Sequence, residues 1–281
     1  MGRALYTALG YTRKMGSGFR HNIDPRWFEI GGIGIRYYTV FFLAAFVGGY
    51  VLFRWQAARG GYPRGSVPRL LVFTVLGVLI GARLAHCLLY QPAYYLTHPR
   101  SILFLWRGGL ASHGAFVAML GVLALTARRY RRPVLDIFDR FTFPAAYGAA
   151  LVRLGNFFNS EIVGRETDVP WGVRFVRYDA GSRLRHPSQL YECVVCLFCL
   201  GLLLWCDRTW GKEKRPLGGL SAVFLVVYFT ARFFIEFTKA FQRPMGASLL
   251  TMGQYLSILP ILVGVYLLVR VYARGRRTMD T

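Results

Sequence analysis

The sequence has little charge, and most of that charge is of one sign. Only 17% of the 281 residues are charged, and 13 acidic residues stand against 35 lysines and arginines, a formal net charge of +22. A soluble nucleic-acid-binding protein of this charge carries far more charged and far fewer apolar residues. A disordered chain is excluded as well, because 54% of the residues are hydrophobic. We therefore expect no nucleic acid among the partners.

Familiar catalytic and metal-binding motifs are also missing. The sequence contains no P-loop, no zinc-protease pattern and no nucleophile elbow. Cys193, Cys196 and Cys199 share a three-residue spacing but lie in an apolar segment without a fourth ligand. We interpret them as packing residues and expect neither a metal site nor a cofactor. Residues 1–36 lack an apolar core long enough for a cleaved signal peptide.

What the sequence does contain is long apolar runs with very few ionisable residues. A helix needs about 20 mainly apolar residues to cross a bilayer. Seven runs approach this length: residues 37–53, 70–90, 110–127, 141–158, 191–206, 217–237 and 249–269. They predict an all-α polytopic membrane protein with about seven transmembrane helices. The predicted transmembrane domain is 37–271, preceded by a tail (1–36), followed by a tail (272–281) and carrying a small cap at 160–187.

Lysines and arginines in the short connections predict the orientation. Four groups of four fall after alternate runs: Arg54, Arg59, Arg64 and Arg69; Arg128, Arg129, Arg131 and Arg132; Arg208, Lys212, Lys214 and Arg215; and Arg270, Arg274, Arg276 and Arg277. Basic loops remain on the cytoplasmic side. We therefore expect the N-terminus and the cap outside the cell, and the C-terminus in the cytoplasm of a multi-pass protein.

Polar residues inside the runs gather toward one side of the membrane. With alternating helix directions, the outer ends carry Tyr38, Arg83, His113, Arg153, Asn156, Asn159, Glu161, Glu192, Arg232, Glu236 and Gln254. Ionisable residues in membrane segments cost several kcal/mol unless they are paired or hydrated. Their gathering on one side predicts a single polar cavity that opens near the outer leaflet.

The spacing of these residues suggests a ligand. Tyr228, Arg232 and Glu236 are four residues apart and form one stripe of a helix. A structural alternative stays open, in which Arg232 and Glu236 form a buried ion pair that orients helices. Arg83 and Arg153 would join Arg232 in a net positive pocket. Because guanidinium groups match phosphate oxygens, this pocket favours a phospholipid headgroup.

Several separated segments resemble one family of enzymes. The longest is Arg153-Leu-Gly-Asn156-Phe-Phe-Asn159-Ser-Glu161-Ile-Val-Gly164-Arg165. The others, in order along the chain, are Asn22-Ile-Asp-Pro25 leading to Tyr38, Gly108-Gly-Leu-Ala-Ser-His113-Gly114, Pro170-Trp-Gly172, His186-Pro-Ser-Gln-Leu-Tyr-Glu192, Arg232-Phe-Phe-Ile-Glu236 and Gly253-Gln254. Over roughly residues 22–270 the chain resembles the bacterial prolipoprotein diacylglyceryl transferases.

The resemblance implies a seven-helix enzyme of the bacterial plasma (inner) membrane that acts in lipoprotein biosynthesis. Members transfer the sn-1,2-diacylglyceryl group of phosphatidylglycerol to the lipobox cysteine thiol in the signal peptide of a preprolipoprotein. The products are a thioether-linked lipid and glycerol-1-phosphate, and no cofactor takes part. The partners implied are therefore phosphatidylglycerol, the preprolipoprotein signal peptide and membrane lipid.

The resemblance also implies roles for individual residues. Essential roles fall on Tyr38, His113, Arg153, Asn156, Gly164 and Arg232, with Glu161 and Glu236 important; Arg83, Asn159, Tyr228 and Gln254 complete the expected substrate site. We expect Arg153 and Arg232 to contact the phosphate, with Arg83 and Asn156 as helpers. His113 is the leading base, and Glu236 and Glu161 are its rivals. We expect Tyr38 to bind the headgroup and Gly164 to allow close backbone approach.

Departures from the family pattern keep alternatives open. Ser160 stands where the family usually has glycine, and Ala115 follows Gly114 where a second glycine is usual. A divergent paralogue could bind phosphatidylglycerol or lipoproteins without turnover. A small-solute transporter is the other alternative, although it would favour polar residues at both helix ends and internal repeats.

Overall fold

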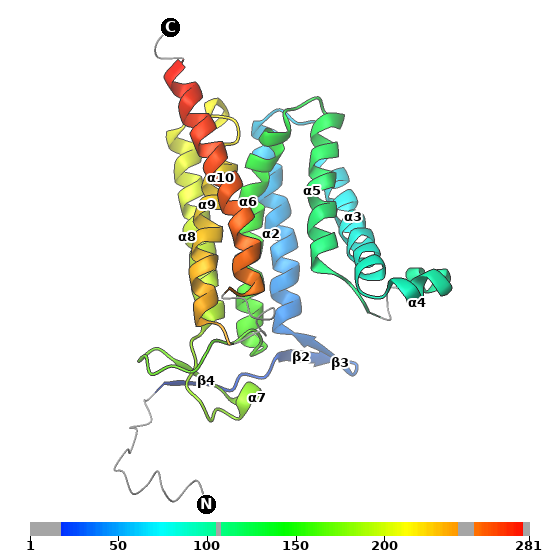
Figure 1. Ribbon diagram of the computed structural model, residues 1–281, viewed down its shortest axis with the longest axis vertical. Helices are drawn as coiled ribbons and strands as arrows, with labels where there is room; N and C mark the ends of the chain where they lie inside the picture. The colour runs from blue at the N-terminus through cyan, green and yellow to red at the C-terminus, as the bar shows by residue number, and fades with distance from the viewer. Residues whose placement is uncertain (1–17, 105–107, 241–249, 278–281) are drawn as a thin grey trace, which may run out of the picture.

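Seven long helices form a bundle in the computed structural model, which describes residues 18–104, 108–240 and 250–277 (Figure 1). The long helices are α2 (Tyr37–Arg59), α3 (Ser66–Leu89), α5 (Ser112–Arg129), α6 (Val134–Phe158), α8 (Ser188–Thr209), α9 (Gly219–Ile235) and α10 (Met252–Arg277). The short ones are α4 (Pro92–Thr97), η1 (Pro99–Leu103), α7 (Val176–Asp179), η3 (Lys212–Lys214) and η4 (Glu236–Thr238). Most of each predicted apolar run falls in one long helix, where backbone polar groups are satisfied internally.

Five of these helices are long and apolar enough to cross a membrane by themselves. They are α2, α3, α8, α10 and α9 together with η4. Many of their large apolar side chains are exposed, as expected of a surface that faces lipid. The fold is therefore that of an all-α polytopic membrane protein, and a total of seven spans stays a prediction.

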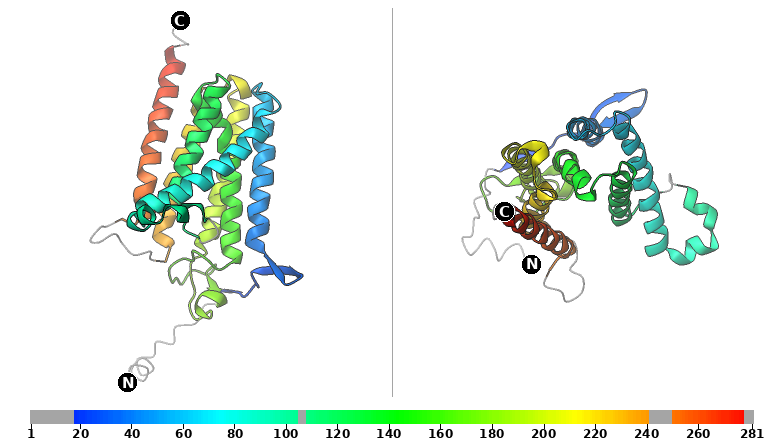
Figure 2. Two further views of the ribbon diagram at one scale, coloured as in Figure 1. Left: turned by 90° about the vertical axis from the view of Figure 1, so that its right-hand side faces the viewer. Right: turned by 90° about the horizontal axis from the view of Figure 1, so that it is seen from above.

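Helix α6 occupies the middle of the bundle. It packs against α2, α5, α8 and α9. Helices α3 and α5 form a pair on one side, whereas α8, α9 and α10 lie on the other side (Figures 1 and 2). A helix surrounded in this way can carry charged residues, because neighbouring helices supply their partners.

Within the described part of the chain, four short strands cover one end of the bundle, which we call the cap end. Strand β1 (Phe19–His21) pairs in parallel with β4 (Val173–Phe175). Strands β2 (Arg26–Ile30) and β3 (Ile33–Arg36) form an antiparallel hairpin that leads directly into α2. The predicted N-terminal tail therefore contributes a strand to the cap instead of standing apart from it.

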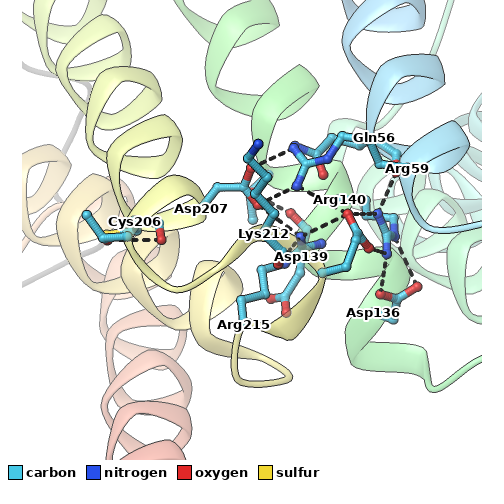
Figure 3. A network of polar contacts seen from close by, with 12 residues as sticks. Gln56, Arg59, Asp136, Asp139, Arg140, Cys206, Asp207, Lys212 and Arg215 are labelled. Atoms are coloured by element: carbon cyan, nitrogen blue, oxygen red, sulfur yellow. Dashed lines mark hydrogen bonds and ion pairs between the residues drawn. The ribbon is translucent and has the colours of Figure 1, made fainter.

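A cluster of charged side chains lies at the end of the bundle opposite the cap (Figure 3). Asp207 of α8 pairs with Arg59 of α2 at 2.7 Å and with Arg215 at 2.9 Å. Arg140 of α6 pairs with Asp136 at 2.9 Å and with Glu213 at 2.6 Å. These ion pairs join α2, α6, α8 and the segment before α9.

The helix that contains the fourth apolar run begins earlier than the run itself. Helix α6 begins at Val134 and not at residue 141, because its first turns carry Asp136, Asp139 and Arg140, whose charges are satisfied by neighbouring segments. Polar side chains thus occur at both ends of α6, and the expectation that they gather at one end holds only within the apolar runs. Arg59 and Arg215, which belong to the basic groups that predict the orientation, also hold helices together through their ion pairs with Asp207.

Asp139 connects α6 to the beginning of α9. Its carboxylate accepts hydrogen bonds from the backbone N–H groups of Gly218 and Ser221 at 2.7 and 2.8 Å, and from the Ser221 hydroxyl at 2.7 Å. The first N–H groups of a helix have no partner within it. Asp139 is fully buried and therefore caps α9 from a neighbouring helix.

We expect Asp139→Ala to lower the free energy of unfolding by about 3 kcal/mol, because buried amide donors at the start of α9 lose a charged acceptor. Thermal unfolding in detergent micelles measures this as a lower Tm. Glu29→Ala, which removes an exposed carboxylate from the β2–β3 hairpin, is the control and should leave the Tm nearly unchanged. Equal Tm values for the two variants would contradict the capping role.

Candidate active site at the cap end

Five charged side chains meet at the cap end, and we call them the Glu192 cluster: Arg153, Glu192, Arg232, Glu236 and Lys239. The Glu192 carboxylate pairs with Arg153 Nε at 2.7 Å, Arg232 Nη1 at 3.1 Å and Lys239 Nζ at 2.9 Å. Lys239 also pairs with Glu236 at 2.9 Å. Residues from α6, α8, α9 and η4 are thereby joined around one buried carboxylate.

Burial differs between the members of this cluster. The Glu192 side chain is only 2% exposed, whereas those of Arg153 and Arg232 are 15% and 22% exposed. Three cations stand against two carboxylates, so the cluster itself carries one net positive charge. The partly open guanidinium groups can therefore receive an anion while Glu192 holds them in position.

A chain of amides extends the cluster toward the cap. Arg153 Nη1 donates to Asn156 Oδ1 at 3.4 Å, and Asn156 Nδ2 donates to Glu161 Oε2 at 3.3 Å. Asn159 Nδ2 donates to the other Glu161 oxygen at 3.1 Å. Glu161 is exposed and its backbone carbonyl accepts from Gln189 Nε2 at 2.6 Å. The expected group of Arg153, Asn156, Asn159 and Glu161 is thus brought together.

Gly164 lies where two other segments approach its backbone. Its N–H donates to the His186 carbonyl at 2.9 Å, and it forms a β-bridge with Lys239. A Cβ at this position would lie 2.3 Å from the His186 carbonyl oxygen and 2.8 Å from that of Thr238. Only glycine permits this approach, which agrees with the expectation from the sequence and positions the segment that carries Lys239.

An apolar cavity of about 450 Å³ lies between α2, α3, α5 and α6. Phe42, Phe46, Leu71, Val75 and Met119 are among the side chains that line it. The Tyr38 ring stacks on Phe42 at 6.0 Å and packs beside Gly155, next to Asn156. Tyr38 therefore connects the polar residues of α6 with the apolar cavity.

Arg83 is not brought into the Glu192 cluster. This 3% exposed residue donates hydrogen bonds to the backbone carbonyls of Ser101, Ile102, Gly108, Gly109 and Phe104. It holds the connection between α3 and α5 against α3. A phosphate contact by Arg83 stays a prediction, and its hydrogen bonds favour a structural role.

His113, Gln254 and Tyr228 also lie outside the cluster's ion pairs. His113 is exposed near the start of α5. Gln254 is buried, accepts from Thr251 N at 2.9 Å and donates to the Phe233 carbonyl at 3.5 Å, which holds α10 against α9. Tyr228 lies one turn before Arg232 and stacks on Phe224. Their substrate contacts stay predictions.

Arg232 and Glu236, the two charged residues of the predicted stripe on α9, do not pair with each other. Arg232 pairs with Glu192 of α8, whereas Glu236 pairs with Lys239 three residues later. The reason is that α9 ends at Ile235, and the tighter turn η4 begins at Glu236. Arg232 therefore fixes the contact of α9 with α8.

Sequence reasoning missed two members of the cluster as site residues. Glu192 was the sole ionisable residue of its apolar run, which was a usable signal. Lys239 follows the sixth apolar run, and only the bridge from Gly164 and the turn of η4 bring it back to Glu192. No spacing in the sequence reveals that approach.

The chain is similar to known proteins over most of its length. A family model described as prolipoprotein diacylglyceryl transferase matches residues 25–270. A phosphatidylglycerol–prolipoprotein diacylglyceryl transferase of Chloroherpeton thalassium is 41% identical over 251 residues, 88% of this chain and 92% of the relative. Proteins of the same name from Tolumonas auensis and Cupriavidus pinatubonensis are 40% and 39% identical, covering 88% and 91% of this chain and 95% and 94% of their own lengths.

We expect Glu192→Gln to lower the free energy of unfolding by about 3 kcal/mol, because three neighbouring cations lose their shared buried counter-charge. Glu166→Gln is the matched control, since Glu166 forms an exposed ion pair with Arg183 in the cap and should matter by less than about 1 kcal/mol. Thermal unfolding of both variants measures the difference. Similar Tm values would show that Glu192 does not organise the cluster.

Proposed function

The chain belongs to the prolipoprotein diacylglyceryl transferase family, and we propose that it transfers the diacylglyceryl group of phosphatidylglycerol to a cysteine thiol of a preprolipoprotein. The observation that carries the proposal is the Glu192 cluster, with two partly exposed arginines at the cap end of a membrane helix bundle. An enzyme that takes its lipid substrate from the bilayer needs an anion site of this kind at the level of the headgroups.

In the proposed reaction the thiol sulfur attacks the glyceryl carbon that bears the phosphate. The C–S bond forms, the C–O bond breaks, glycerol-1-phosphate leaves with the electron pair, and the thiol proton passes to a base. Negative charge grows on the leaving phosphate, and we assign its stabilisation to Arg153 and Arg232, because fixed cations lower the energy of such a charge. Asn156 supports Arg153 through the hydrogen bond between their side chains. No metal or redox partner is needed for the balance.

The proposed base is His113, because histidine is the side chain that most often serves as a general base. Its exposed place near the start of α5 leaves it accessible to a second substrate. Glu161 is the rival with geometric support, since Asn156 connects it to Arg153. Glu236 is less suited, because it is buried against Lys239.

We place an acyl chain of the lipid in the apolar cavity between α2, α3, α5 and α6. Its lining is apolar, and a fatty acyl chain is the part of the substrate that fits such a lining. Tyr38 lies between this cavity and Asn156, so its ring and hydroxyl suit the boundary between tail and headgroup. The proposed site also includes Gly164, Asn159 and Tyr228, which lie close to its charged residues. Gln254 belongs to it because it holds α10 against α9.

We also propose that the cap end faces outward across the bacterial plasma membrane. The four basic groups lie toward the other end, which would then be cytoplasmic and carry the C-terminus. The cluster and the cap would meet the lipobox cysteine of the signal peptide as it emerges from the outer leaflet. Exposed apolar side chains of α3 and α10, among them Phe73, Ile80, Leu259 and Leu262, would contact the remaining partner, membrane lipid.

We expect Arg153→Ala and Arg232→Ala each to lower the transfer rate at least a hundredfold, because fixed positive charge at the leaving group is lost. The assay is transfer from phosphatidylglycerol in vesicles to a synthetic lipobox peptide. Arg140→Lys is the control, a buried ion-paired arginine at the opposite end whose change should affect Tm but not the rate per folded molecule. Near-normal transfer by either alanine variant would remove the phosphate role.

We expect His113→Ala to lower kcat about 10²-fold or more with a small change in KM, because proton removal from the thiol slows. The same peptide assay over a range of pH measures it, with Glu161→Gln run in parallel. Near-normal turnover by His113→Ala would contradict the assignment. A loss in Glu161→Gln alone, together with loss of the acid limb of its pH profile, would assign the base to Glu161.

A further inference from the structure

A histidine of strand β1 is completely buried under the cap. His21 has no exposed surface, and its ring packs edge-on against Phe157 at 4.5 Å and beside Phe175 at 5.5 Å. Its Nδ1 forms a hydrogen bond of 3.3 Å with the Ser160 hydroxyl. The family model begins at residue 25, so this contact comes from a segment outside the matched region.

Ser160 has a backbone conformation that side chains disfavour. Its φ is +56°, in the left-handed region. The Ser160 N–H donates to the Phe157 carbonyl at 3.0 Å, and the Glu161 N–H donates to the Asn156 carbonyl at 2.9 Å. This pair of bonds is the Schellman arrangement that ends a helix, and its left-handed position is usually glycine. Ser160 therefore needs outside support.

The turn at Ser160 decides where the next side chain lies. Because Glu161 is bonded back to Asn156 through the backbone, its carboxylate reaches the amides of Asn156 and Asn159 at 3.3 and 3.1 Å. Asn156 in turn contacts Arg153. A shift of the Ser160 turn would move Glu161 away from this chain of contacts.

We propose that His21 is a positioning residue for the transfer reaction, which holds the left-handed turn at Ser160 and so keeps Glu161 against Asn156 and Asn159. The deletion of this contact would loosen the turn without removing any group that touches substrate. The proposal rests on the proposed function, because the positioned residues matter only if they serve transfer.

The surroundings of His21 suit a neutral imidazole. Burial lowers the pKa of His21, and the positive charge of Arg177 on α7 acts in the same direction. Helix α6 and strand β4 present the uncharged rings of Phe157 and Phe175, while Arg177 is itself held by Asp24 at 3.4 Å and by the Ile23 carbonyl at 2.9 Å. An uncharged imidazole can form the hydrogen bond between its Nδ1 and the Ser160 hydroxyl at neutral pH.

The test is a double-mutant cycle of the full chain with His21→Phe and Ser160→Gly, because glycine adopts the left-handed turn without support. Transfer kinetics are measured with phosphatidylglycerol vesicles and a lipobox peptide, and hydrogen–deuterium exchange follows the amides of residues 160–161. His98→Phe, at an exposed site on the connection between α3 and α5, is the matched control. His21→Gln is added as a polar replacement.

We expect His21→Phe to lower kcat about fivefold with little change in KM and to speed exchange at 160–161. In the Ser160→Gly background the same change should alter kcat less than about twofold and leave exchange unaffected. His21→Gln should retain more activity than His21→Phe.

Equal losses in both backgrounds, or unchanged exchange at 160–161, would overturn the proposal. If His21→Phe does not fold, the comparison uses His21→Gln with and without Ser160→Gly, and additive effects there overturn it as well. No transfer by the parent chain would refute the proposed function. The exchange measurements would still decide whether His21 holds the turn, since they need no turnover.

Discussion

The buried carboxylate of Glu192 is the interaction on which the cap end depends. It lies within 3.1 Å of cationic nitrogens from Arg153, Arg232 and Lys239, which come from three different segments. In a membrane each of these cations would be costly without a partner. By satisfying all three, one glutamate orients α6, α9 and the segment after η4 while leaving the arginines partly exposed.

The same physical rule organises the opposite end for a different purpose. There Asp207, Arg59, Arg140 and Glu213 are joined in ion pairs, and Asp139 caps α9. This network holds helices together at an end where we assign no reaction. At the cap end three cations meet two carboxylates, and the excess positive charge suits a phosphate. In the opposite network three arginines, Arg59, Arg140 and Arg215, meet three carboxylates, Asp136, Asp207 and Glu213. The net charge of each group therefore distinguishes the structural network from the candidate active site.

Much of the candidate site was predictable, because burying polar residues in apolar runs is costly. Arg153, Asn156, Asn159 and Glu161 lie together, as expected from their place at the outer end of the fourth apolar run. The phosphate contact of Arg83 stays a prediction, and its hydrogen bonds in the structure go to loop carbonyls. The sequence shows that an arginine inside a membrane helix needs partners, and it does not show whether those partners are backbone or substrate.

Seven helical segments and the motifs of the family can be recognised from the amino-acid sequence alone. Run length and hydrophobicity suffice for the helices, because helix geometry acts locally. The family rests instead on the separated motifs that resemble it. Three contacts are visible only in the folded structure. Glu192 is the shared counter-ion of the cluster, Lys239 returns to it beside Gly164, and His21 contacts Ser160. Each of these contacts joins segments far apart in the chain, and packing rather than spacing brings them within hydrogen-bonding distance.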